Sequence, residues 1–339
     1  MFEANLVRRL ATQHLATLQN LNRLRLDLEG DFQGLEDAIL GLILSVASGE
    51  PLLLIGPPGT AKSMLIRTFC SLVGIEREKT GGYFEYLLTP FTEPGELFGF
   101  YDPKSLVDPN SDLKRINENR MMQNAAVVFL DEIFKGSSAI LNALLSFMNE
   151  RVFYDRGLPV PVKLRCLLAA SNELPESTEL QAVSDRFALR CRVDNVAEDG
   201  ASLEALMKKA WPLTYGRSNR RVAYPGLLDG LKALQTEIRG LDSLFQPHAD
   251  VFPILAQLVQ LARTNGVSAL SNRRLVKFTY VMLIHRLFDL ARGDPKTVAG
   301  KGCVRAEELR LLPKYFLDDD TKEEPIAQMD AAIKEWARR

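Results

Sequence analysis

Eight consecutive residues have the spacing of a phosphate-binding loop: Gly56, Pro57, Pro58, Gly59, Thr60, Ala61, Lys62 and Ser63. The usual pattern is a glycine, four free positions and then Gly-Lys-Ser/Thr, and Ala61 stands where the second glycine is expected. Glycines let such a loop fold so that its backbone N–H groups point at phosphate oxygens. Lys62 would reach the β- and γ-phosphates, and Ser63 would hold a magnesium ion. The alternative is a Gly/Pro-rich turn with a chance lysine.

Two adjacent carboxylates follow an apolar segment about 70 residues further on, a spacing typical of nucleotide hydrolases. Residues 126–130 are apolar, and Asp131 and Glu132 come directly after them. Asp131 would hold magnesium, usually through water, and Glu132 would polarise an attacking water as general base. The alternative is an ordinary end of a strand with acidic surface residues, and the phosphate loop upstream argues against it.

Polar residues also follow two later apolar segments. Asn172 comes after residues 164–170, where an amide can orient the attacking water or sense the γ-phosphate, although asparagine also favours turns. Arg186 precedes the segment 188–193 and is a candidate to stabilise charge on the phosphoryl group. If it acts from a neighbouring subunit, oligomerisation becomes part of the active site. An ion pair with Asp185 is the simpler alternative for Arg186.

Buried parallel strands and helices are needed to bring these residues together. The segments 52–55, 83–88, 126–132, 164–170 and 188–193 read as strands. Residues 64–73 are compatible with a helix after the loop, which would add the positive end of its dipole to a phosphate site. At the carboxyl edge of a parallel sheet, the two acids would lie beside the phosphate loop. The sequence therefore predicts an α/β body.

From residue 198 onward the pattern is helical. Helices are expected at 203–211, 225–241, 251–264, 271–291, 305–311 and 326–336, with an acidic linker at 318–324. We expect three parts: N-terminal helices and the α/β body at 1–195, a helical lid at 196–312, and the linker with a terminal helix at 313–339.

Composition excludes several classes of protein. The 339 residues are 46% hydrophobic and 25% charged, with a net charge of −1, so no general attraction to nucleic acid or anionic membranes is indicated. No apolar run is long enough to span a bilayer and no signal peptide is recognisable, so a soluble cytoplasmic protein is expected. Four scattered cysteines indicate reduced thiols, and three isolated histidines show no metal-ligand spacing.

With these motifs placed, the chain resembles the AAA+ ATPases, and within them the MoxR group, closest to its RavA-like branch. The resemblance covers nearly the whole chain. It rests on the segments GPPGTAKS, TPFTEPGELFG, VVFLDEI, ILNALLSFMNER, AASNE and SDRF, which occur in the family's order.

The resemblance implies a fold and a set of sites. The expected fold is a five-stranded parallel sheet between helices, followed by an all-α lid. Asn172 would be the first sensor, Arg186 the trans-acting arginine finger, and Arg273 the lid sensor that reaches the γ-phosphate, with the adjacent Arg274 as the other choice. ATP and Mg²⁺ are the implied cofactors, Ser63 and Asp131 the metal ligands, and the nucleotide would contact Gly56, Pro57, Pro58, Gly59, Thr60, Ala61, Lys62, Ser63 and Met64. Alanine at position 61 is tolerated in the RavA-like branch.

The implied function is a ring-forming ATPase, expected as a hexamer, that remodels or activates a protein partner as a chaperone. That partner is expected to carry a von Willebrand A (vWA) domain. An insertion at 100–117 and a hairpin at 151–162 would face the pore, where Phe98, Phe100 and Tyr101 either grip the client or anchor the insertion. The alternatives are a nucleic-acid motor or clamp loader, which the near-neutral charge weakens, and a non-hydrolysing switch, which the Asp131–Glu132 pair argues against.

Overall fold

The computed structural model describes residues 1–339 except 77–80, 108–113, 176–177, 197–198, 217–221 and 294–302. The strands are β1 (Leu52–Ile55), β2 (Tyr83–Leu87), β3 (Val127–Asp131), β4 (Val152–Asp155), β5 (Leu158–Pro161), β6 (Cys166–Ser171) and β7 (Leu189–Arg192). The helices are α1 (Ala4–Gln13), α2 (Leu15–Asp31), α3 (Glu36–Ser48), α4 (Lys62–Val73), α5 (Pro94–Phe98), α6 (Pro103–Val107), α7 (Ser138–Asn149), α8 (Thr178–Ser184), α9 (Gly200–Tyr215), α10 (Leu227–Arg239), α11 (Val251–Thr264), α12 (Asn272–Leu290), α13 (Ala306–Tyr315) and α14 (Glu323–Arg338), with 3₁₀ turns η1 (Glu118–Arg120), η2 (Met122–Asn124) and η3 (Ile133–Lys135).

Five strands form one sheet in the order β2-β3-β6-β1-β7, and every neighbouring pair is parallel. The predicted α/β fold with a five-stranded parallel sheet and a helical C-terminal region is therefore confirmed. Because β6 lies between β1 and β3, the residues that follow these three strands meet at one edge of the sheet. The hairpin β4–β5 is antiparallel and stands apart from this sheet.

The two faces of the sheet belong to different hydrophobic clusters, as alternation along a strand requires. Leu52 and Leu54 of β1 join the cluster that includes α3 and α4, whereas Leu53 and Ile55 join the cluster that includes α5 and α7. Helices therefore cover both faces, and strands buried on both sides read in the sequence as continuous apolar runs.

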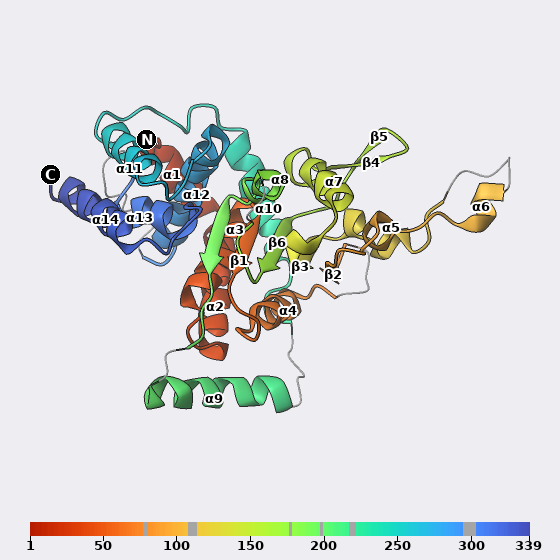
Figure 1. Ribbon diagram of the computed structural model, residues 1–339. Coiled ribbons are helices and arrows are strands. Elements are labelled where there is room, and N and C mark those ends of the chain that lie inside the picture. Colours follow the sequence, from red (N-terminus) through yellow and green to blue (C-terminus); the bar gives the residue numbers. More distant parts are fainter. Residues whose placement is uncertain (77–80, 108–113, 176–177, 197–198, 217–221, 294–302) are drawn as a thin grey trace.

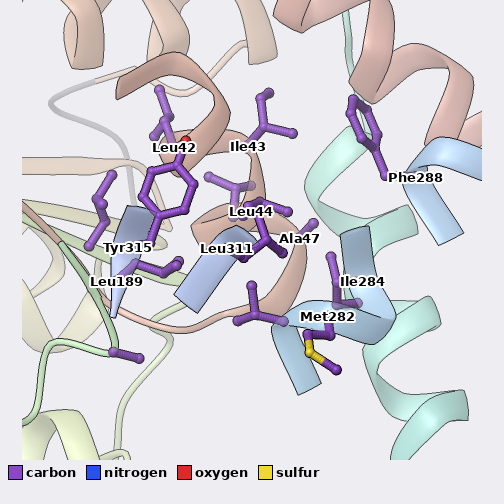
Figure 2. Packing of buried hydrophobic residues seen from close by; sticks show 14 of the residues in the cluster. Leu42, Ile43, Leu44, Ala47, Leu189, Met282, Ile284, Phe288, Leu311 and Tyr315 are labelled. Atoms are coloured by element: carbon purple, nitrogen blue, oxygen red, sulfur yellow. The ribbon is translucent and has the colours of Figure 1, made fainter. Parts of the chain in front are cut away.

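Helix α3 is the centre of the larger cluster, and nearly all of its residues are buried. A helix that is apolar all round must be covered on several sides. Figure 2 shows Leu42, Ile43, Leu44 and Ala47 of α3 packed among side chains of α12, α13 and β7. Since this one cluster joins N-terminal helices, sheet and C-terminal helices, the division at 1–195, 196–312 and 313–339 stays a prediction.

The segment before α14 is tied to β7 by carboxylates. Asp318 accepts hydrogen bonds from the guanidinium groups of Arg190 and Arg274, the latter at 2.6 Å, and Asp320 accepts from Arg192 at 3.0 Å. Arg274 is fully buried and also donates to the carbonyl of Phe316. The acidic linker thus joins the C-terminal helices to the edge of the sheet.

The insertion and the hairpin are joined to each other. Asp155 of the hairpin accepts hydrogen bonds from the hydroxyl of Tyr101 and from Arg115, both at 2.7 Å. Phe98 is buried and stacks on Phe153 with 4.5 Å between ring centroids, so Phe98 anchors the insertion. Residues 108–113 of the predicted insertion lie outside the described residues; in Figure 1 its described part, with α6, and the hairpin project from the same side of the sheet.

All four cysteines are buried and free, as expected for reduced thiols. Among the residues that the structure describes, none of the helices has the length and apolarity needed to cross a bilayer.

Candidate functional site

The loop between β1 and α4 is held in place by close backbone contacts. The N–H of Gly56 donates to the carbonyl of Ser171 at 3.1 Å, next to Asn172. A Cβ on Gly56 would lie 1.9 Å from the carbonyl oxygen of Val193, so only glycine fits there. The first glycine of the motif is therefore explained by a close approach of the chain.

The substituted position of the motif has the backbone shape of a glycine. Ala61 adopts a left-handed conformation with φ of 61° and precedes α4 as its N-cap. No side chain caps this helix. Because the first N–H groups of a helix have no partner within it, those of α4 remain to bind an anion.

Lys62 points into the loop rather than into solvent. Its Nζ donates to the carbonyls of Gly56 and Pro57 at 2.7 and 2.8 Å, and lies 3.2 Å from Oγ1 of Thr60. Burial lowers the pKa of Lys62, and the carboxylates of Asp131 and Glu132 oppose this shift. The ammonium group is thus held by carbonyl oxygens that phosphate oxygens could replace.

The two expected metal ligands meet across the sheet edge. The hydroxyl of Ser63, in the first turn of α4, donates to Oδ2 of Asp131 at the end of β3, at 3.0 Å. A hydroxyl and a carboxylate are hard oxygen donors that suit Mg²⁺, which takes one or two carboxylates together with substrate phosphates. The residues therefore fit the implied metal.

Glu132 lies beside this pair and is held by two neighbours. Its backbone is left-handed, with φ of 53°. The side-chain amide of Asn172 donates to its Oε1, and Nζ of Lys135 lies 3.4 Å from the same oxygen. Asn172 follows β6, between the loop after β1 and the acids after β3, so the sheet order explains why these two side chains meet.

A small pocket of about 100 Å³ adjoins the phosphate loop. Gly59, Ala61 and Met64 line one side of it. The other walls come from the end of α2 and the segment between α2 and α3, the segment after β7, and α9: Asp31, Phe32, Gln33, Leu35, Asp194, Asn195, Val196, Leu206, Lys209, Ala210 and Leu213. Its mixed apolar and polar lining, next to the phosphate loop, suits a flat heterocyclic ring.

The arginines form a separate group. The side chain of Ser271, at the start of α12, hydrogen-bonds Asp185, which adjoins Arg186. Burial lowers the pKa of Arg186, and the nearby charge of Arg273 lowers it further, so the two guanidinium groups share one surface. Arg186 also lies 4.0 Å from Asp185. Arg274 is buried and its guanidinium group already has hydrogen-bond partners, so the exposed Arg273 is the candidate sensor.

The structure thus brings together two sets of predicted residues. Lys62, Ser63, Asp131, Glu132 and Asn172 converge at the loop. Arg186 and Arg273 lie close to each other and form no hydrogen bond or ion pair with those five residues in the described part of the chain. Sequence reasoning missed Lys135 and the small pocket, because their roles depend on contacts with other segments. Ser271 entered the sequence analysis only as the first residue of the helix expected at 271–291, and in the structure it caps α12.

A family model described as the MoxR domain in the MoxR-vWA-beta-propeller ternary systems matches residues 19–235. Two uncharacterized proteins of Methanocaldococcus jannaschii are 38% identical over 173 residues and 39% over 170 residues. These matches cover 51% and 50% of this chain and 43% of each relative, so the chain spans less than half of their length. A structural protein of Acidianus two-tailed virus is 31% identical over 159 residues, covering 46% of this chain and 25% of the viral protein.

A crystal structure from Cytophaga hutchinsonii, provisionally described as an ATPase, has the same fold. It superposes with a TM-score of 0.62 at 16% identity, covering 97% of this chain and 96% of the other. At this identity the likeness concerns the fold.

Proposed function

The chain belongs to the family of MoxR domains, and from this premise we propose that it is a ring-forming, Mg²⁺-dependent AAA+ ATPase that remodels or activates a protein partner. One observation carries the proposal: Ser63 and Asp131 lie 3.0 Å apart at the sheet edge where Asn172 also contacts Glu132. Metal ligands and a general base with its orienting amide are the parts that phosphoryl transfer to water needs. Within the family we propose the RavA-like branch, with which Ala61 is compatible.

The nucleotide would bind with its phosphates on the loop Gly56–Ser63 and its adenine in the adjoining pocket. Bound Mg²⁺·ATP would supply the scissile phosphoanhydride bond and a Lewis acid. Lys62 would exchange its carbonyl contacts for phosphate oxygens, which keeps the ammonium group hydrogen-bonded throughout. Ser63 and Asp131 would hold the metal, and Met64 would contact the nucleotide from the first turn of α4.

Glu132 would take a proton from the attacking water, and Asn172 would orient both groups. In the structure the amide of Asn172 and the ammonium of Lys135 both contact Glu132. These contacts fix the position of the carboxylate beside the metal ligands, which a general base requires.

Arg186 and Arg273 would act on the nucleotide of the neighbouring subunit. Their closeness to each other supports a shared role, which we place in trans. An arginine finger supplied by a neighbour typically raises the rate about a thousandfold or more. Ring assembly, expected as a hexamer, would therefore complete the active site.

Movements caused by ATP hydrolysis would pass from the nucleotide site through β6 to the hairpin. Asn172 follows β6, and the hairpin β4–β5 precedes the same strand. The contacts of Asp155 with Tyr101 and Arg115 would then move the hairpin and the insertion as one unit. We propose a vWA-domain protein as the partner, in keeping with the family's description, and a chaperone role in metal insertion or activation.

Phosphate release by the wild type and by Glu132→Gln tests the proposal. We expect Mg²⁺-dependent release by the wild type and almost none by the variant, although both bind ATP. Equal rates would remove Glu132 from the mechanism. Capture of partners by Glu132→Gln held in ATP would then identify the client, and strong stimulation by DNA would contradict the remodelling role.

A further inference from the structure

A second concave site lies at the edge of the sheet where the strands begin, opposite the phosphate loop. Its volume is about 660 Å³. The walls are the residues just before β3 and β6, the end of α4 at Val73 and Gly74, and one face of α10. The opposite face of α10 is buried in the core through Leu227, Leu231 and Leu234.

The lining of this cavity is strongly basic. Arg151, Lys163, Arg165, Lys232 and Arg239 line it, and among the lining residues that the structure describes Asp229 is the one acidic side chain. The whole chain has a net charge of only −1, so this is a local concentration of cations rather than a property of the surface. Cations gathered in a concave site focus the potential on an anionic ligand.

Most of these cations lack an acidic partner. Asp229 lies 3.2 Å from Arg165. Within the residues that the structure describes, no carboxylate forms an ion pair with Lys163, Lys232 or Arg239. Segregated like charges destabilise a fold unless an anion neutralises them.

The hydrogen bonds of Arg165 and Arg151 also indicate an anion site. The Nη1 atom of Arg165 is buried and has no acceptor among the residues that the structure describes, and an unmade hydrogen bond at a buried donor is unfavourable. Arg151 donates to the backbone carbonyls of Leu164 and Gly49, and its acceptors in the described part of the chain include no carboxylate. Burial lowers the pKa of Arg151; the charge of Glu50 opposes this shift, and the charge of Arg239 adds to it. A bound anion would relieve both the unmade hydrogen bond and the repulsion.

We propose that this cavity binds a small molecule that carries several phosphate groups. Guanidinium forks and lysine ammonium groups are the side chains that recognise phosphate oxygens. A cavity of several hundred cubic ångströms has the size of a small-molecule site. Gly226 and Leu228, at the start of α10, add the positive end of a helix dipole. The site is distinct from the phosphate loop, because it lies where the strands of the sheet begin, whereas the phosphate loop lies where they end.

The proposal is tested by calorimetric titration with inorganic tripolyphosphate. The protein is the full chain carrying Lys62→Ala, without divalent cations, so that the phosphate loop does not compete. We expect one saturable site. Adding Lys163→Ala with Lys232→Ala should weaken binding about tenfold or more, because two charge-assisted contacts are lost.

The matched control adds Lys208→Ala with Lys334→Ala, which removes the same charge from α9 and α14. These lysines pair with Glu204 and Asp330 on their own helices. This control should bind tripolyphosphate like the parent. The proposal fails if no saturable binding occurs or if both double variants weaken binding equally. It also fails if a single-stranded oligonucleotide binds there in preference to tripolyphosphate, because the surface would then recognise nucleic acid.

Discussion

The hydroxyl oxygen of Ser271 lies 3.0 and 3.1 Å from the two carboxylate oxygens of Asp185, although 86 residues separate them. The same hydroxyl accepts a hydrogen bond from the N–H of Arg274 at 3.4 Å and so caps α12. Arg186 follows Asp185, and Arg273 lies in the first turn of α12. The contact between Ser271 and Asp185 therefore fixes the positions of the two arginines relative to each other.

Asp185→Ala should lower the ATPase rate about 10- to 100-fold, because small displacements of a catalytic group carry losses of this size. The affinity for ATP should change little, since the phosphate loop is unaltered. Turnover and nucleotide binding, measured on the same preparation, check this. Glu204→Ala on α9 is the control and should leave both unchanged. If the affinity for ATP fell by as much as the ATPase rate, Asp185 could not act through the arginines alone, and the account would be contradicted.

Asn172→Ala should lower kcat about 100-fold or more with ATP binding retained, because Glu132 loses the amide that orients it. Single-turnover hydrolysis at saturating ATP measures this step directly. Lys135→Ala removes the more exposed neighbour of Glu132 and should have a much smaller effect. Near-normal hydrolysis by Asn172→Ala would show that Glu132 is positioned by other groups.

The phosphate loop and the two acids could be predicted because each is a local pattern at the end of an apolar strand. The choice between Arg273 and Arg274 could not, because the two are adjacent on α12. The structure distinguishes the two arginines through Asp318, 44 residues later, which forms an ion pair with the buried Arg274. Asp185 was seen only as a partner for Arg186, because the sequence does not reveal its contact with Ser271. The basic cavity was missed for the same reason, since its cations come from segments far apart in the chain.

Asp318→Asn should lower the free energy of unfolding by about 2 kcal/mol at neutral pH. Removing one partner of a buried ion pair costs about 3–5 kcal/mol, and we reduce this figure because Asp318 is itself partly exposed. The variant leaves two buried guanidinium groups, Arg190 and Arg274, without their carboxylate. Asp320→Asn is the matched control, because it removes a half-exposed pair with Arg192 and should cost at most about 1 kcal/mol. Denaturant unfolding of both variants tests the difference.

The loss at Asp318 should depend on pH with a defined sign. Burial tends to raise the pKa of Asp318, but the charges of Arg190 and Arg274 outweigh it and hold the pKa below its ordinary value of 3.8. A lowered pKa contributes stability above the unfolded pKa, and this contribution disappears as the pH falls through the folded pKa. The gap between wild type and Asp318→Asn should therefore narrow below about pH 4. A gap that stayed constant would exclude the charge of Asp318 as its cause.

Gly56→Ala should weaken ATP binding about tenfold or more, because the new Cβ would clash with the carbonyl of Val193 and displace the phosphate loop. Gly157→Ala is the control: this hairpin glycine also has a positive φ, of 78°, but a Cβ there meets nothing within 4 Å. Its ATP affinity should match that of the wild type. Equilibrium binding of a fluorescent ATP analogue distinguishes the two, and normal binding by Gly56→Ala would contradict the packing argument.

The central claim is that a second copy of the chain completes the active site, and mixing two inactive variants tests it most directly. Lys62→Ala disables the phosphate loop, and Arg186→Ala removes the finger. Each alone should hydrolyse almost no ATP, whereas an equimolar mixture should recover up to about a quarter of the wild-type rate, because that share of the interfaces in a random ring pairs an intact loop with an intact arginine. No recovery on mixing, or full activity of Arg186→Ala by itself, would contradict the account.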